Sequence, residues 1–418
     1  MSETNEHESE DQPSFEFPIV GKKEKAHSRG IVGVFTYDIG EHGYGLISIG
    51  HDSLKVWKVD TDESGATNFS FNHEISKWRC GVQSCDATAD GRCVSIIGLD
   101  SILYEVIIGE SGPVVTAYDL GYMETWHIRI ARNKINYMTT SFSGFISEVN
   151  MSGEFSRREA VNHVKQISVI SYSNDNRLLA VGNLEGVVRT YEVSTFKNLN
   201  SYEIHAMKIR AIVFLPDDDK FLTASDDKTL KLFSLTTGST IHTYCGCSSP
   251  ISCVALELNK FDGRFFATGC VNGDVLFWTT SIVVPLCSIS TQHEGGVWSM
   301  AFSPDGRNLL TAGEDKRIIC YNVPDMDLPT ESLNTLRPID APVDDDAEMS
   351  VDNPAFKEVY VKRDIHDDYE AEHSVKPAIR EQVDTNHDDE ADYHGLMKPQ
   401  IDPVQPYDID KVEMDTNS

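Results

Sequence analysis

Basic residues are scarce in this sequence. Its 418 residues include 36 Lys and Arg against 66 Asp and Glu, which gives a formal net charge of −30 at pH 7. Binding to nucleic acid depends mainly on clustered basic residues that neutralise phosphates, so this balance argues against a direct nucleic-acid partner. No apolar run approaches the roughly 20 residues that a membrane-spanning helix needs, and we expect no membrane association.

The motifs of common catalytic and metal sites are also missing. The sequence has no GxxxxGKS/T phosphate loop, no GxSxG nucleophile turn and no HExxH zinc motif. Its nine cysteines follow no zinc-ligand spacing. One residue separates Cys245 from Cys247, where a zinc-binding pair needs at least two, and the sequence has no second pair of cysteines at zinc-ligand spacing. We therefore expect no enzyme activity, no cofactor and no metal. The odd cysteine count and the lack of a signal peptide predict reduced thiols, in the cytosol or nucleus.

What the sequence does contain is a repeated unit. Two stretches carry the same four residue types at identical spacing: His205, Thr223, Asp227 and Phe233 in the first, and His293, Thr311, Asp315 and Tyr321 in the second. In both, the Asp follows the Thr by four residues and the aromatic follows the Asp by six, while the His precedes the Asp by twenty-two. A unit of about 40–45 residues with these marks is typical of a β-propeller blade.

Stepping along the chain by this period predicts seven units. Their starts are separated by 42 to 48 residues, which is enough for four short strands, and they fall at His27, His73, Gly121, His163, His205, Cys247 and His293. Apolar residues alternate within the late strand of each unit, as a strand with one buried face requires. The sequence therefore predicts an all-β fold, a seven-bladed propeller over residues 14–324. Residues 14–20 are expected to close the ring by pairing with the strand that ends at 322–324.

The repeated polar residues have a structural interpretation. A His, a Ser or Thr, an Asp and a Trp can bond in series beneath the turn that joins the two middle strands, and buried polar groups left unpaired cost about 1–3 kcal/mol each. On this basis we expect structural roles for His27, Ser48, Asp52, Trp57, His205, Thr223, Asp227, His293, Thr311, Asp315 and Trp278.

The two ends of the chain differ from the repeats in composition. Residues 1–13 contain five acids and no Lys or Arg, and residues 325–418 contain 26 acids against 8 bases. Neither end shows a sustained strand or helix period, so we expect both to be disordered. The C-terminal segment could keep the protein soluble, or it could attract basic partners such as histones.

Unit by unit, the sequence resembles the family of WD-repeat (WD40) subunits shared by the Ski (superkiller) complex and the RNA polymerase II-associated factor complex. The resemblance covers roughly residues 15–324 and is carried by HAMKIRAIVFLPDDDKFLTASDDKTLKLF (205–233), METWHIRI (123–130), HEGGVWSMAFSPDGRNLLTAGEDKRIICYNVP (293–324), and the opening AHSRGIVGV with HDSLKVWKV. Family members are compact, so the long acidic tail is a departure that leaves the set of partners open.

The resemblance implies a non-enzymatic scaffold in the nucleus and cytoplasm. In the Ski complex such a subunit joins a tetratricopeptide subunit and an RNA helicase, which feed cytoplasmic mRNA to the exosome for 3′-to-5′ decay. In the polymerase-associated factor complex it accompanies elongating polymerase and supports histone modification. The resemblance also implies that partners are held on the top face of the propeller through a short Gln-Arg-x-x-apolar segment.

Propeller geometry places two positions of each unit on that top face. One begins the innermost strand, five residues after the initial His, and the other directly precedes the turn Asp. These positions and their neighbours give the predicted partner-binding residues, which are Trp126, Trp298, Phe142, Glu124, Asp226, Glu314, Arg210, Lys208, Gln83, Leu99 and Leu184. The apolar members could hold an anchor side chain, and the carboxylates could pair with a partner Arg. Each Trp could instead be a core residue of its inner strand.

Two other functions remain open from the sequence. The chain could be a WD40 substrate receptor or a histone-tail reader in another chromatin or ubiquitin-ligase complex, although a methyl-lysine cage would need more aromatics than this face offers. A hydrolytic or lyase propeller would need carboxylates or metal ligands clustered at the central channel, and the predicted inner-strand starts do not provide them.

Overall fold

The described part of the chain is built entirely from strands and turns. The computed structural model describes residues 15–40, 43–62, 66–76, 78, 80–109, 112–120, 125–131, 136–141, 143–150, 155–160 and 166–328. Within those ranges it contains 28 strands. No helix in the same ranges has the length and apolarity needed to cross a membrane.

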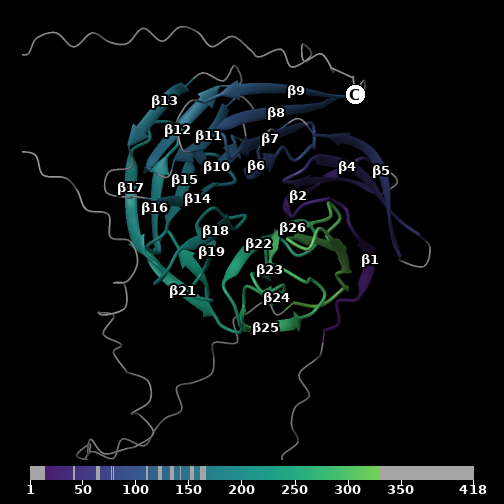
Figure 1. Cartoon of the computed structure of the whole chain (residues 1–418). Helices are drawn as coiled ribbons and strands as arrows, with labels where there is room; N and C mark the ends of the chain where they lie inside the picture. Colours follow the sequence, from purple (N-terminus) through teal and green to yellow (C-terminus); the bar gives the residue numbers. More distant parts are fainter. Residues whose placement is uncertain are drawn as a thin grey trace, which may run out of the picture. The chain divides into compact units, whose positions relative to one another are not determined.

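The strands form seven four-stranded antiparallel sheets, which we number as blades in chain order (Figure 1). Blade 1 contains β2 (Ile31–Asp38), β3 (Tyr44–Gly50), β4 (Leu54–Thr61) and β5 (Thr67–Ile75). Blade 2 contains β6 (Val82–Ala87), β7 (Cys93–Gly98), β8 (Ile102–Gly109) and β9 (Gly112–Asp119). Blade 3 contains β10 (Thr125–Ile130), β11 (Asn136–Ser141), β12 (Phe145–Asn150) and β13 (Phe155–Ala160).

The remaining four blades repeat this arrangement. Blade 4 contains β14 (Ile167–Tyr172), β15 (Leu178–Asn183), β16 (Val187–Glu192) and β17 (Asn198–Glu203). Blade 5 contains β18 (Ile209–Phe214), β19 (Lys220–Ser225), β20 (Leu230–Ser234) and β21 (Ser239–Tyr244). Blade 6 contains β22 (Ile251–Glu257), β23 (Phe265–Cys270), β24 (Val275–Thr279) and β25 (Ile282–Ile289). Blade 7 combines β26 (Val297–Phe302), β27 (Asn308–Gly313) and β28 (Ile318–Asn322) with β1 (Ile19–Lys23). The predicted seven-bladed, all-β propeller is thereby confirmed.

The first strand of each blade faces a common centre. Each of these inner strands contacts the inner strand of the next blade, and the contact between β2 and β26 closes the ring (Figure 1). Side chains fix neighbouring inner strands to one another. Ser299 Oγ accepts a hydrogen bond from the Val34 backbone N–H at 3.0 Å, and Asp86 Oδ2 accepts one from the Ile130 N–H at 2.8 Å. These bonds satisfy backbone donors at the centre, where two sheets meet edge to edge.

The cores lie between adjacent blades, because each sheet buries both faces against its neighbours. Every residue of β3 is buried, and its sequence YGLISIG correspondingly contains no charged residue. Ile47 of blade 1 packs in one cluster with Val94 and Ile96 of blade 2. The outer strands are much more exposed, as β17 shows, so they can carry polar residues on both faces.

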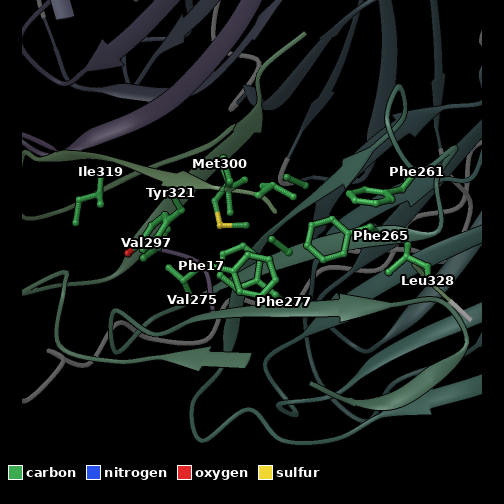
Figure 2. Close-up of a cluster of buried hydrophobic side chains, with 14 residues drawn as sticks. Phe17, Phe261, Phe265, Val275, Phe277, Val297, Met300, Ile319, Tyr321 and Leu328 are labelled. Carbon is green, nitrogen blue, oxygen red and sulfur yellow. The ribbon is translucent and has the colours of Figure 1, made fainter. Parts of the chain in front are cut away.

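Ring closure depends on the N-terminal strand. β1 pairs with β28 in antiparallel register, with Ile19 opposite Tyr321 and Lys23 opposite Ile318. The sequence predicted a closing strand at residues 14–20, which is wrong in its bounds, because the paired strand spans Ile19–Lys23. The preceding Phe17 is instead a core residue. Its ring stacks on that of Phe277 with centroids 3.8 Å apart (Figure 2).

The segment after β28 packs into the same cluster. Leu328 is 8% exposed and lies with Phe261 and Phe265 in the core between blades 6 and 7 (Figure 2). Lys260 holds the start of this segment, because its Nζ donates hydrogen bonds to the carbonyl oxygens of Val323 and Pro324 at 2.9 and 3.1 Å. The packed chain therefore continues beyond residue 324, where the sequence placed the boundary of the propeller.

Among the described residues, three blades carry a hydrogen-bonded polar group beneath the turn between their second and third strands, which we call the blade-turn network. In blade 1, His27 Nδ1 lies 2.9 Å from Asp52 Oδ1 and His27 Nε2 lies 2.8 Å from Ser48 Oγ. Trp57 Nε1 donates to the same Ser48 Oγ at 2.8 Å. Equivalent contacts in blades 5 and 7 join His205 to Asp227 and Thr223, and His293 to Asp315 and Thr311.

Blade 2 replaces this polar group by apolar packing. His73 was predicted to begin that unit, but it is an exposed residue of β5 opposite Val56, so this assignment is wrong. Trp78 precedes β6 at the spacing that the network histidines show, and its ring lies 6.2 Å from that of Tyr104. Ile96 stands where blades 1, 3, 5, 6 and 7 have Ser or Thr. Two further predicted unit starts, Gly121 and His163, lie outside the described residues.

Phe17→Ala should weaken ring closure. The substitution removes a ring that is 4% exposed and stacked on Phe277, so we expect the free energy of unfolding to fall by about 3–5 kcal/mol in urea denaturation. Phe71→Ala is the control, because Phe71 is 53% exposed on β5 and should cost less than about 1 kcal/mol. Equal losses in the two variants would show that Phe17 does not hold the ring closed.

Acid should destabilise the propeller through two of its network histidines, those of blades 1 and 5. Burial lowers the pKa of His27 and of His205 below the ordinary value of 6.5, although their Asp partners oppose this shift. The unfolded histidines bind protons first as the pH falls, so their contribution is present above pH 6.5 and is lost as the pH falls through the folded pKa values. We expect the unfolding free energy to decrease between pH 7.5 and 5.5, by at most about 1.4 kcal/mol per histidine for each pH unit below 6.5.

The slope should be smaller in His205→Gln, which cannot titrate in this range. Chemical denaturation at a series of pH values measures both slopes. A wild-type stability that stays constant from pH 7.5 to 5.5 would contradict this assignment of the buried, neutral histidines.

Candidate protein-interaction site

One backbone hydrogen bond recurs in six blades and defines a single face of the propeller. In each case the N–H donor is the residue just before the turn between the second and third strands. The acceptor is the carbonyl oxygen of the residue that directly precedes the inner strand of the same blade. The pairs are Leu99 with Gly81, Asp226 with Lys208, Glu314 with Gly296, His51 with Gly30, Leu184 with Gln166 and Val271 with Pro250, at 2.9–3.3 Å. We call the surface formed by these residues and the inner-strand starts the upper face.

Trp126 and Lys208 meet on the upper face although they belong to different blades. Trp126 is half-buried in β10 of blade 3, and Lys208 directly precedes β18 of blade 5. The Lys208 Nζ lies 5.5 Å from the centroid of the Trp126 ring, within the range of a cation–π contact. Burial, with the nearby charge of Arg210, lowers the pKa of Lys208. The indole therefore already has a cation of this chain over its ring.

Arg210 and Asp226 form a two-pronged ion pair within blade 5. Arg210 Nε contacts Asp226 Oδ1, and Arg210 Nη2 donates to Asp226 Oδ2 at 3.2 Å. The sequence proposed Asp226 as a carboxylate for a partner Arg. In the structure a partner Arg would have to compete with Arg210, whereas Glu314 is exposed and makes no ion pair that the described residues record.

The inner strands of all seven blades surround a central channel with a volume of about 590 Å³. Gln83, Arg210 and Trp298 line it at the inner-strand starts. Gly296 leaves room for the Trp298 indole, because a Cβ at that position would lie 3.1 Å from the ring. Trp298 is half-buried in β26 and lines the channel.

The channel wall carries charge as well as apolar surface. Arg129 Nη1 lies 3.9 Å from Asp86 Oδ1, and burial raises the pKa of Asp86 in spite of this neighbour. Burial also lowers the pKa of His127, and the charges of Arg129 and Lys208 act in the same direction. In the described part of the chain no group of three or more His, Cys, Asp and Glu side chains could hold a metal ion.

The remaining predicted residues lie apart from this centre or outside the description. Leu99 is 62% exposed at the blade 2 turn, and Leu184 is half-buried at the blade 4 turn. Glu124 and Phe142 lie outside the described residues. The structure thus brings together Trp126, Lys208, Arg210 and Asp226, while Leu99 and Leu184 contribute separate positions along the upper face.

Sequence reasoning missed two residues of the upper face. His51 occupies in blade 1 the position of Leu99 in blade 2, and its Nδ1 accepts a hydrogen bond from the Val82 N–H at 3.1 Å. Its place directly before Asp52 was a signal that could have identified it. Met207 is 51% exposed beside Lys208, and no spacing rule distinguishes it from an ordinary loop residue.

The comparisons with known proteins agree with this architecture. Residues 196–234, 238–279 and 285–322 match the family model for the "WD domain, G-beta repeat". Each matched segment begins at the outer strand of one blade and ends with the third strand of the next, as 196–234 does from β17 to β20. The repeat in the sequence is therefore offset from the sheet by one strand.

Curated relatives cover most of the propeller. The chain is 26% identical to "WD repeat-containing protein SL1-17" of Schistosoma mansoni over 60% of this chain and 81% of that protein. It is 24% identical to a "Guanine nucleotide-binding protein subunit beta" of Zea mays over 65% and 76%. It is 31% identical to rat "Apoptotic protease-activating factor 1" over 36% of this chain and 12% of that protein.

The fold makes this chain a β-propeller of seven blades. Three of its segments match the WD repeat, so the chain contains WD repeats. WD40 propellers typically act as non-enzymatic interaction scaffolds, and the matching family model is not that of an enzyme.

Proposed function

We propose that this chain is a non-enzymatic scaffold whose upper face binds short segments of other proteins. The observation that carries the proposal is the meeting of Trp126 with Lys208 beside the Arg210–Asp226 pair at the start of the inner strands. Aromatic and Arg side chains dominate the binding energy of many interfaces. A half-buried indole set in a rigid ring needs little ordering on binding, which favours affinity.

The partner segment should combine an apolar anchor with a polar, charged residue. Trp298 and Leu99 offer apolar surface, and the exposed Glu314 offers a carboxylate for a partner cation. This chemistry suits the Gln-Arg-x-x-apolar segment that the sequence resemblance implies. The cation of such a segment would compete with Lys208 for the ring of Trp126.

We further propose that the assemblies are the Ski complex and the RNA polymerase II-associated factor complex. The support is the resemblance of residues 205–233, 123–130 and 293–324 to the WD-repeat subunit that the two complexes share. The direct partners would be the tetratricopeptide and RNA-helicase subunits in the cytoplasm, and subunits of the polymerase-associated complex in the nucleus. The chain would not bind nucleic acid itself, since it carries 66 acids against 36 bases.

Trp298→Ala and Trp126→Ala should each abolish co-purification of the tetratricopeptide and helicase subunits. Loss of an aromatic anchor commonly costs 2 kcal/mol or more, which is about a 30-fold weaker complex. The melting temperature should stay within a few degrees, because both rings are only half-buried. Phe71→Ala, on the outer strand of blade 1, should bind like wild type. A large loss of stability with binding intact would show that the two indoles serve the core.

Removal of the acidic segment should leave the scaffold functional if the truncation ends after Leu328. Residues 1–328 keep the packed Met326 and Leu328, so we expect one cooperative unfolding transition at nearly the wild-type temperature. Affinity purification of both lengths, followed by mass spectrometry, compares their partners. Retention of the same complexes supports the upper face as the binding site, whereas recovery of histones or ubiquitin-ligase subunits only with the full chain would assign the binding to the tail.

A further inference from the structure

Blade 6 carries a cysteine where three other blades have the network histidine. Cys247 precedes Ile251, the first residue of β22, by four residues, as His205 precedes Ile209 of β18. The Asp position is also changed, because Asn272 stands there and its Nδ2 donates to Asp274 Oδ2 at 2.7 Å. The bond from Trp278 Nε1 to Thr268 Oγ1, at 3.0 Å, remains of the blade-turn network. Asn272 Nδ2 also donates to Ser248 Oγ at 3.0 Å, where Asp52 accepts from Ser28 in blade 1.

A second cysteine of blade 6 points at this same place. Cys270 ends β23 and pairs with Ile251, as Gly50 ends β3 and pairs with Ile31 in blade 1. A Cβ built on Gly50 would lie 2.6 Å from His27 Nδ1, so a side chain at this position is directed at the network histidine. In blade 6 both positions carry thiols, and Cys247 packs against the buried cluster that contains Cys270.

The loop around Cys247 separates it from its neighbour Cys245. Gly246 has φ +141°, a conformation that L side chains rarely adopt, and a Cβ there would lie 2.9 Å from Pro285 Cδ. The chain therefore turns sharply between the two cysteines. Cys245 is exposed, whereas Cys247 is half-buried and packs against the cluster that contains Trp278.

The two facing thiols differ in their environment. Cys270 is buried, and its interaction with Cys247, together with burial, raises its pKa. The same interaction lowers the pKa of Cys247 although burial opposes it. Cys247 is thus the sulfur that more readily becomes a thiolate, and it is also the more exposed of the two. By contrast, burial raises the pKa of Cys253, in the channel wall, to about 12.

We propose that Cys247 and Cys270 are an oxidative modification site, a dithiol that hydrogen peroxide converts to a disulfide on the upper side of blade 6. The Cys247 thiolate attacks one peroxide oxygen and breaks the O–O bond, which gives a sulfenic acid and hydroxide. The Cys270 sulfur then attacks the sulfenic sulfur, and water leaves as the S–S bond forms. In total two thiols and one peroxide give one disulfide and two waters, and the two electrons pass from sulfur to peroxide.

The disulfide would strengthen a contact that the fold already makes. Val271, next to Cys270, donates its N–H to the carbonyl of Pro250 in the loop that carries Cys247, at 3.0 Å. A covalent bond between the same two segments restricts the unfolded chain without moving the folded one far, so oxidation should raise stability. Disulfides in reduced compartments are usually transient and redox-sensing, which fits a bond of this kind.

The experiment treats the reduced full-length protein with hydrogen peroxide, blocks the remaining thiols by alkylation and digests with trypsin. We expect the peptides 232–260 and 265–307 to be recovered as one disulfide-linked species, and the melting temperature to rise by about 2–5 °C. Both effects should be reversed by dithiothreitol.

Single variants assign the bond within those peptides. Cys270→Ser should remove the linked species and the temperature shift, and it suits the fold because Ser225 occupies the same place in blade 5. Cys247→Ala should do the same. Cys245→Ser and Cys287→Ser are the matched controls and should behave like wild type. Loss of the linked species in Cys245→Ser, its persistence in Cys247→Ala, or peroxide oxidation of wild type without any linked species would overturn the proposal.

Discussion

The pairing of β1 with β28 is the constraint on which the propeller depends. Each blade buries both of its faces against its neighbours, so an open ring would leave two sheets with an uncovered apolar face. The last three strands come from the end of the repeats, and the N-terminal strand completes their sheet. Phe17, stacked on Phe277, adds a packed anchor to the backbone pairing, and Leu328 covers the same cluster from the other end of the propeller. Closure therefore joins segments about 300 residues apart, and the rigidity of the upper face follows from it.

Much of this fold was readable from the sequence because the blade-turn network has a fixed spacing. His205, Thr223 and Asp227 must sit at set intervals to bond to one another, so the same intervals recur wherever the network recurs. The start of blade 2 was predicted wrongly because its turn is held by apolar packing of Trp78. Apolar contacts do not require residues at fixed intervals in the sequence. The closing strand was misplaced for a related reason. The alternation of Phe15 and Phe17 fits a strand as well as a core-packed segment, and pairing register is decided by the partner strand, which a local pattern does not contain.

The candidate site was predictable in outline and not in its contacts. Counting five residues from each network position leads to the inner-strand starts, and this reached Trp126, Arg210 and Trp298. It could not show that Lys208 of blade 5 extends to the Trp126 ring of blade 3, because that contact crosses an intervening blade. Nor could it show that Asp226 is engaged by Arg210, since two residues sixteen apart in the chain meet only through the register of β18 and β19. Which side chains meet across the ring is therefore decided only when the ring closes, and local sequence patterns do not contain this information.

One position of the blade thus carries three chemistries in this chain. It holds His in blades 1, 5 and 7, Trp78 in blade 2 and Cys247 in blade 6. The fold tolerates the changes because most of the stabilising burial comes from strand residues between blades. The residue at this position is only partly buried against a cluster, as Trp78 and Cys247 are, or contributes a few hydrogen bonds per blade. A position that is dispensable for the ring in one blade can take on another role there without endangering closure. In blade 6 the Cys247 side chain packs against the cluster that contains Cys270, and the proposed dithiol would replace a network that only stabilises with one that can also react.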